Sequence, residues 1–222
     1  MIDGILLINK PKGITSYDVI RRLKPLFEKK QKIGHGGTLD PFATGLMIIM
    51  LGKGTKLFDS LQKARKVYDV VGEFGYETET YDVTGERVFE SEKKVCKEEL
   101  YDVLKKFTGE ISQIPPNFSA KKIKGRRAYE LARKEVDFKL GPKKVNIYSL
   151  ELVDFDFPKF ELKIECSSGT YIRSLVVDIA RELETFATPV DLCRTRIGDY
   201  TLDEAVELDG VNLERDVRSF HL

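Results

Sequence analysis

The sequence has few of the residues and segments that mark secreted, metal-binding or membrane-spanning proteins. Its three cysteines, Cys96, Cys166 and Cys193, lie far apart and form no CxxC pair. This spacing predicts free thiols in a reducing compartment and argues against a disulfide framework or a zinc site. The longest unbroken apolar run, Leu46 to Leu51, is far shorter than the ~20 residues that span a bilayer. The opening MIDGILLINK has no basic n-region and no cleavage site, so we expect no signal peptide and a cytoplasmic protein.

An excess of charge of one sign is also lacking. Lys and Arg number 37 against 36 Asp and Glu, so any affinity for nucleic acid has to come from a local patch. The 41% hydrophobic content excludes a disordered chain. We find no internal repeat, low-complexity tract or Gly/Ser linker. We therefore expect a single domain over residues 1–222.

One segment stands apart in charge. Residues 121–144 contain ten basic and three acidic residues, a local excess of seven positive charges. Two interpretations have equal weight on charge alone. The segment is either a solvated helix face or a protruding basic loop that contacts phosphates.

Strand and helix patterns follow one another without a regular βαβ rhythm. We predict strands at 4–9, 66–74 and 160–166, and helices from Thr15 or Ser16 to about Pro25, at 98–107 and at 172–183. The first helix should bury Tyr17, Ile20, Leu23 and Phe27. This mixture predicts an α+β fold around a mixed, largely antiparallel central sheet flanked by helices.

The most unusual stretch is GHGGTLDPFATG at residues 34–45, which holds four glycines, one of only two histidines and an Asp-Pro pair. Glycines let the backbone approach a ligand closely, and Pro41 biases Asp40 to an extended conformation. A lone aspartate is more often a turn or cap residue than a catalytic one. The spacing in Gly52-Lys53-Gly54-Thr55 does not match GxxxxGK[ST], and no GxGxxG follows a strand. No ATP or dinucleotide site is therefore expected.

Arg173 and Tyr68 each have an ordinary explanation beside a functional one. Arg173 falls in the first turn of a predicted helix, where the helix dipole disfavours a cation. Such a position indicates an anionic partner nearby, and a structural salt bridge would explain it equally well. Tyr68 lies on the apolar face of its predicted strand, where a core tyrosine is the default.

The order of the motifs is more specific than any of them alone. The stretches are NKPKGITS, GHGGTLDPFATG, KVYDV, GYETETYDVTGE, IPPNFSAKKIKGRRAYELAR, SSGTYIRSL and LCRTRIGDY. In this order the sequence resembles the bacterial tRNA pseudouridine synthases of the TruB family, from Gly4 to about Leu208. The resemblance implies the pseudouridine synthase fold, with residues 119–144 as a basic, RNA-contacting loop insertion.

The same resemblance implies an isomerase that converts the uridine at position 55, in the T loop of tRNA, to pseudouridine. The base would be flipped out, its N-glycosidic bond broken, and the base rejoined through carbon. No cofactor and no metal are implied. Asp40 matches the catalytic aspartate of the family. The sequence leaves open whether it attacks C1′ of the ribose or C6 of the base, or assists a glycal route.

Other roles follow the same positional matches. Tyr68 matches the tyrosine that stacks on the flipped base, Arg173 the arginine paired with the catalytic carboxylate, and Asp82 the acidic residue that completes this network. An arginine fork orients a partly buried carboxylate and keeps it ionised. The resemblance assigns substrate binding to His35, Lys10, Tyr171, Leu192, Lys121, Lys122 and Lys124.

Some expectations concern the extent and partners of the protein. Many family members carry a small C-terminal RNA-binding domain that this sequence lacks, so affinity for tRNA would depend more on the basic loop. We expect a monomer. The alternatives are a non-catalytic RNA-binding or tRNA-folding protein with the same fold, and a synthase that acts on other RNA hairpins.

Replacing Lys121, Lys122 and Lys124 by glutamine tests the basic loop. If these lysines bind phosphates, the substitutions weaken tRNA binding and reduce the slope of log Kd against log salt by about one for each phosphate that is no longer neutralised. Binding titrations over a range of salt concentrations measure that slope. An unchanged slope would make the segment a solvated face.

Overall fold

The computed structural model describes residues 1–119, 121–123, 126–132, 136, 138 and 140–220. The chain divides into two compact units. Unit 1 comprises Met1–Asp69 and Asp191–Leu222, and unit 2 comprises Val70–Val190. Two strands, β4 (Lys66–Phe74) and β12 (Ala187–Ile197), each begin in one unit and end in the other.

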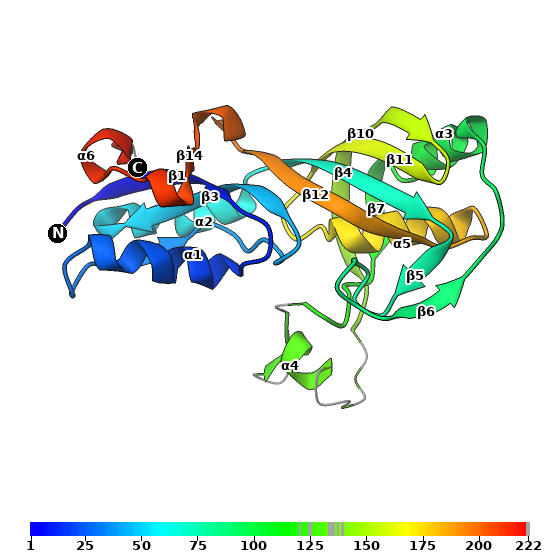
Figure 1. Ribbon diagram of the computed structural model, residues 1–222, viewed down its shortest axis with the longest axis horizontal. Helices are drawn as coiled ribbons and strands as arrows, with labels where there is room; N and C mark the ends of the chain where they lie inside the picture. Colours follow the sequence, from blue (N-terminus) through cyan, green and yellow to red (C-terminus); the bar gives the residue numbers. More distant parts are fainter. Residues whose placement is uncertain (120, 124–125, 133–135, 137, 139, 221–222) are drawn as a thin grey trace. The chain divides into compact units, whose positions relative to one another are not determined.

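Unit 1 is built around β1 (Gly4–Lys10) and β3 (Thr44–Leu51), which pair antiparallel (Figure 1). On its other side, β1 pairs parallel with β14 (Val206–Glu207). β3 also pairs antiparallel with β2 (Ile33–His35) and parallel with the end of β12, which in turn pairs with β13 (Tyr200–Thr201). The helices of this unit are α1 (Ser16–Leu23), α2 (Phe58–Lys63), α6 (Leu213–Asp216) and the 3-10 turns η1 (Lys24–Leu26), η2 (Gly52–Leu57), η3 (Leu202–Glu204) and η4 (Leu208–Gly210).

The sequence explains how α1 begins and ends. Thr15 is its N-cap and forms a capping box with Asp18, which satisfies two of the free amides of the first turn. The regular helix ends one residue before Lys24, and Pro25 follows in a 3-10 turn because proline cannot continue an α-helix. The prediction that Tyr17 belongs to the buried face was wrong, since its side chain is 61% exposed. The buried face of α1 instead consists of Ser16, Val19, Ile20 and Leu23.

Unit 2 contains strands in the order β4, β11 (Lys159–Cys166), β10 (Lys143–Asp156) and β7 (Gly109–Gln113). β10 pairs antiparallel with both of its neighbours. Two small antiparallel pairs accompany them, β5 (Tyr76–Thr78) with β6 (Arg87–Glu90), and β8 (Lys122–Ile123) with β9 (Arg126–Arg127). The helices are α3 (Lys97–Lys106), α4 (Ala128–Ala132) and α5 (Ile172–Glu182).

Side-chain alternation places the core of unit 2. Along β11, Phe160, Leu162, Ile164 and Cys166 are buried, whereas the charged residues between them lie toward solvent. The apolar residues of α5 are spaced at helical intervals and are buried as well. The strand and both helices predicted for this unit are therefore confirmed, each to within one residue or so.

The α+β fold with a mixed, largely antiparallel sheet is confirmed. The long strands β10 and β12 were not predicted. β12 contains Pro189, and a proline inside a run of residues argues against a strand. Within the described residues, no helix is long and apolar enough to cross a membrane.

Candidate active site

The residues expected to form the site fall on both units, and each unit is described by itself. Unit 1 carries Lys10, His35, Asp40, Tyr68 and Leu192. Unit 2 carries Asp82, Lys121, Lys122, Tyr171 and Arg173. Lys124 lies outside the described residues, and Lys122 is described by its backbone in β8 alone.

Asp40 lies in the segment that connects β2 to β3, and it is partly exposed. The residue before it is held to α1, because Ser16 Oγ donates to Leu39 O at 3.0 Å and Leu39 N donates to Ser16 Oγ at 2.8 Å. The carbonyl of Asp40 accepts a hydrogen bond from Ala43 N at 3.1 Å, which closes a turn. The carboxylate is thus carried by a backbone that is fixed on both sides.

Lys10 is completely buried at the end of β1. Its ammonium donates to the carbonyls of Pro11 at 2.9 Å, Ile14 at 2.8 Å and Pro41 at 3.4 Å. Its pKa is lowered from 10.5 to about 8. Burial is the main cause and the Arg194 charge adds to it, while the carboxylates of Asp40 and Asp18 act in the opposite direction. The structure therefore brings Lys10 close to the Asp40 segment, where it binds carbonyls of the chain itself. Contact between Lys10 and a substrate stays a prediction.

The other predicted residues of unit 1 lie on strands. His35 ends β2 and pairs with Ile49 of β3. Tyr68 lies in β4 and is partly exposed. Leu192 lies in β12, is buried, and its carbonyl accepts from the hydroxyl of Thr44 at 3.5 Å.

Arg194 is a residue of this unit that sequence reasoning missed. It is 2% exposed, and its guanidinium donates to three backbone carbonyls. These belong to Leu46 at 2.9 Å, Thr38 at 3.3 Å and Gly37 at 3.3 Å. Its signal was present in the motif LCRTRIGDY, but nothing in that stretch indicates which arginine is buried.

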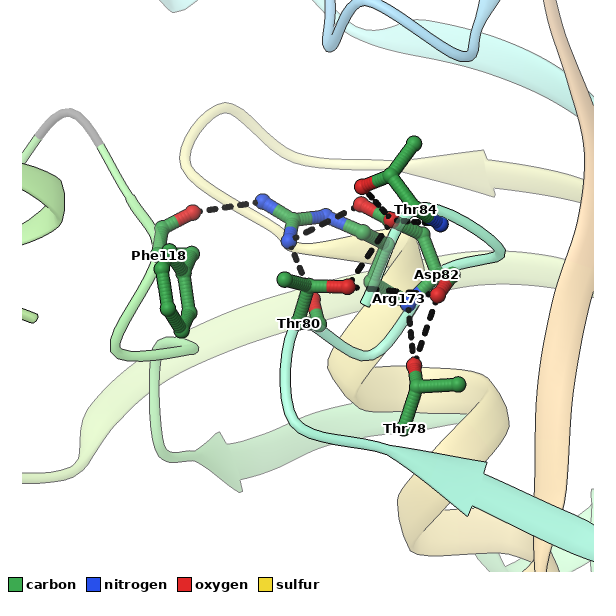
Figure 2. A network of polar contacts seen from close by, with 6 residues as sticks. All are labelled: Thr78, Thr80, Asp82, Thr84, Phe118 and Arg173. Carbon is green, nitrogen blue, oxygen red and sulfur yellow. Dashed lines mark hydrogen bonds and ion pairs between the residues drawn. The ribbon is translucent and has the colours of Figure 1, made fainter. Parts of the chain in front are cut away.

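In unit 2, the Asp82 carboxylate is buried in a network of threonines (Figure 2). Its Oδ1 accepts from Thr80 Oγ1 at 2.9 Å, Thr84 N at 2.9 Å and Thr84 Oγ1 at 2.5 Å. Thr78 holds the backbone of the same residue, because its hydroxyl accepts from Asp82 N and donates to Asp82 O. A carboxylate with this many donors stays fixed in one orientation.

Arg173, in the first turn of α5, faces that network and is 3% exposed. Its Nη1 lies 3.4 Å from Asp82 Oδ2 and donates to Thr80 O at 2.5 Å, while Nη2 donates to Phe118 O at 2.9 Å (Figure 2). The structure thus brings Arg173 and Asp82 together. The ion pair also explains why a cation is tolerated at the start of a helix.

The backbone at Tyr171 is fixed by Gln113, another residue that the sequence did not single out. Tyr171 N donates to Gln113 Oε1 at 2.8 Å, and Gln113 Nε2 donates back to Tyr171 O at 2.9 Å. Ser174 Oγ donates to Ile114 O at 3.0 Å. The start of α5 is therefore attached to the segment that leads into the basic residues, of which Lys121 is partly exposed.

A second charged cluster joins α5 to β5. Arg181 of α5 donates to both carboxylate oxygens of the buried Glu77, at 2.6 and 3.1 Å. Asp178, one turn earlier on α5, has its pKa raised to about 6 by burial and by Glu77, against the opposing effect of Arg181.

The described part of the chain contains no group of three or more His, Cys, Asp or Glu side chains placed to hold a metal ion. The groups of the expected site that could take part in a reaction are the Asp40 carboxylate on its fixed loop in unit 1 and the buried Arg173–Asp82 pair in unit 2.

Comparison with known proteins identifies relatives over almost the whole chain. The family model described as TruB family pseudouridylate synthase (N terminal domain) matches residues 24–172. The tRNA pseudouridine synthase B of Fusobacterium nucleatum subsp. nucleatum is 46% identical over 91% of this chain and 70% of its own length. That of Aquifex aeolicus is 47% identical over 94% of this chain and 73% of its own length.

Solved structures also match this chain over most of its length. The crystal structure of a Cbf5–Nop10–Gar1 complex matches with a TM-score of 0.72 and 27% identity, over 93% of this chain and 52% of that one. An H/ACA RNP bound to a substrate RNA containing 2′-deoxyuridine matches with a TM-score of 0.68 and 25% identity, over 93% of this chain and 51% of that one.

The Asp178→Asn variant tests the charged cluster on α5. The pKa is about 6 in the folded chain against a usual 3.8, so the folded state binds more protons between these values and wild-type stability falls as pH rises through them. The variant removes this loss. We expect the Tm of the variant minus that of wild type to rise by about 4–8 °C from pH 4 to pH 7.5, or roughly 2 kcal/mol. Thermal melts across this range measure it, and a difference that is constant or falls with pH contradicts the prediction.

Proposed function

Because the chain belongs to the TruB family of pseudouridylate synthases and is an RNA pseudouridine synthase, we propose that it acts on tRNA and isomerises the uridine at position 55 of the T loop. The observation that carries this proposal is the match to relatives named tRNA pseudouridine synthase B, at 40–47% identity over most of the chain. The motif order described above supports the same substrate.

Asp40 is the catalytic residue in this proposal. The reaction breaks the bond between N1 and C1′ and forms one between C5 and C1′. The proton on C5 leaves to solvent and N1 takes up a proton, so neither an oxidant nor a reductant is needed. A carboxylate acts as nucleophile when it is ionised and held in place. The fixed backbone on both sides of Asp40 and the electrostatic interaction of its carboxylate with the Lys10 ammonium support this role.

Arg173 and Asp82 orient the catalytic groups in this proposal, and Tyr68 stacks on the flipped base. The buried ion pair and the threonine donors around Asp82 support this role, since they leave the guanidinium little freedom to move. Flipping a base out of its stack costs a few kcal/mol, so stacking and phosphate contacts have to offset it. The lysines at 121, 122 and 124 would contact phosphates, and His35 would help to hold the nucleotide out of the loop. Lys10, Leu192 and Tyr171 would line the substrate site.

We further propose that the protein recognises the T arm as a monomer and works in the cytoplasm. The free cysteines Cys96, Cys166 and Cys193 are in keeping with a reducing compartment. A second candidate substrate is an RNA other than tRNA, which the match to an H/ACA RNP bound to a substrate RNA supports.

Tritium release from tRNA labelled at C5 of uridine tests the proposed function, with wild type and Asp40→Asn compared. We expect release by wild type and none above background by the variant, because an amide is a poor nucleophile. Both proteins should bind tRNA with similar Kd, which shows that the variant is folded. Release by both would remove Asp40 from the chemistry, and release by neither would leave a tRNA-binding or tRNA-folding protein.

The same assay also tests whether the T arm is the substrate. A T-arm hairpin is compared with a hairpin of the same stem and a scrambled loop. We expect turnover of the first alone, and equal turnover of both would contradict the assignment to position 55.

Arg173→Lys tests the role of the buried fork. The lysine keeps the charge but cannot donate to Asp82, Thr80 O and Phe118 O together, so we expect turnover to fall by about 10- to 100-fold, the effect of losing about 1.4–2.7 kcal/mol. Arg181→Lys, on the exposed side of the same helix, is the control and should retain turnover within about threefold. Near-normal turnover by Arg173→Lys would contradict a role for the fork.

A further inference from the structure

Arg194 is a buried cation whose hydrogen-bond acceptors bracket Asp40. Gly37 and Thr38 precede the aspartate and Leu46 follows it, and each accepts from a different nitrogen of the guanidinium. The rigid fork of donors fixes the distances between these three carbonyls. The Arg194 side chain is therefore hydrogen-bonded to the backbone both before and after Asp40.

The backbone of Arg194 is held against the same segment. β12 pairs parallel with β3 at Cys193 with Thr44 and at Arg194 with Gly45. Gly45 has φ +104°, and a Cβ at this position would clash with the carbonyl oxygen of Arg194. Such close approach of two backbones requires glycine. The base of the arginine is thus fixed where the Asp40 segment enters β3.

This arrangement differs from a buried salt bridge that serves stability alone. Burying a guanidinium is costly, and apolar side chains of similar size often serve a core better. Here two of the described hydrogen bonds of the side chain go to the segment that carries Asp40, and the third goes to Leu46 in β3, where that segment leads. Lys10 holds Pro41 O of that segment from β1. Two cations therefore fix the backbone immediately before and after the carboxylate.

We propose that Arg194 is a positioning residue that holds the Asp40 segment in the shape needed for attack on the nucleotide. This inference rests on the proposed role of Asp40. Misplacing a reacting group by about 1 Å costs on the order of 100-fold in rate. Loss of the fork should therefore lower kcat and leave RNA binding nearly unchanged.

The test measures kcat and KM on a T-arm hairpin, Kd and Tm for Arg194→Lys and Arg194→Met. We expect kcat to fall at least about 30-fold in both variants, with KM and Kd within about threefold of wild type. The conservative lysine should not rescue kcat, because one nitrogen cannot occupy the positions of three. If Arg194→Met does not fold, Arg194→Lys alone decides.

Lys66→Met is the matched control. Lys66 is also buried in unit 1, and its ammonium donates to the carbonyls of Leu61 at 3.1 Å, Gln62 at 2.6 Å and Ala64 at 2.7 Å. Its removal should lower Tm about as much as Arg194→Met does, but leave kcat within about threefold when assayed well below the melting range. A fall in kcat that follows the fall in Tm in all variants would show general destabilisation and overturn the inference.

Two other outcomes separate the inference from the proposed function. If Asp40→Asn is inactive and Arg194→Lys has near-normal kcat, or an effect on KM alone, the inference fails while the proposed function stands. If Asp40→Asn retains activity, the catalytic role of Asp40 fails and Arg194 has no reacting group to position.

Discussion

Hydrogen bonds from buried cations to backbone carbonyls hold several loops of this protein in shape. Lys10 and Arg194 bind carbonyls on either side of Asp40, and Lys66 does the same for the end of α2. A buried carbonyl without a hydrogen-bond partner costs free energy, and ordering a loop costs conformational entropy that such hydrogen bonds help to offset. The Asp40 segment is held by these hydrogen bonds together with those between Ser16 and Leu39 and between Ala43 and Asp40.

In unit 2 a buried cation likewise binds backbone carbonyls, and here it also pairs with a carboxylate. Arg173 donates to the carbonyls of Thr80 and Phe118 and pairs with Asp82. The threonine donors saturate one oxygen of Asp82, so the other remains for the arginine. An arginine so constrained presents a fixed charge, which is the requirement for orienting a catalytic group.

Much of the fold could be predicted from the sequence because its signals are local. The cap at Thr15, the break before Pro25 and the alternation along Phe160–Cys166 depend on neighbours within a few residues. Tyr17 was misplaced because helical spacing alone does not say which side of a helix meets the core. β10 was missed because buried and exposed residues do not alternate regularly along it, and β12 because it contains a proline.

The sequence by itself determined the family, the α+β class and the candidate residues Asp40, Asp82 and Arg173, because ordered motifs and periodic patterns are properties of the chain. Only the tertiary structure decided that Arg194 and Gln113 are buried donors, and that Lys10 binds carbonyls of the chain. The sequence does not tell whether the side chain of an arginine faces solvent or a loop. The partners of Arg194 lie up to 157 positions away, and only folding brings them within hydrogen-bond distance.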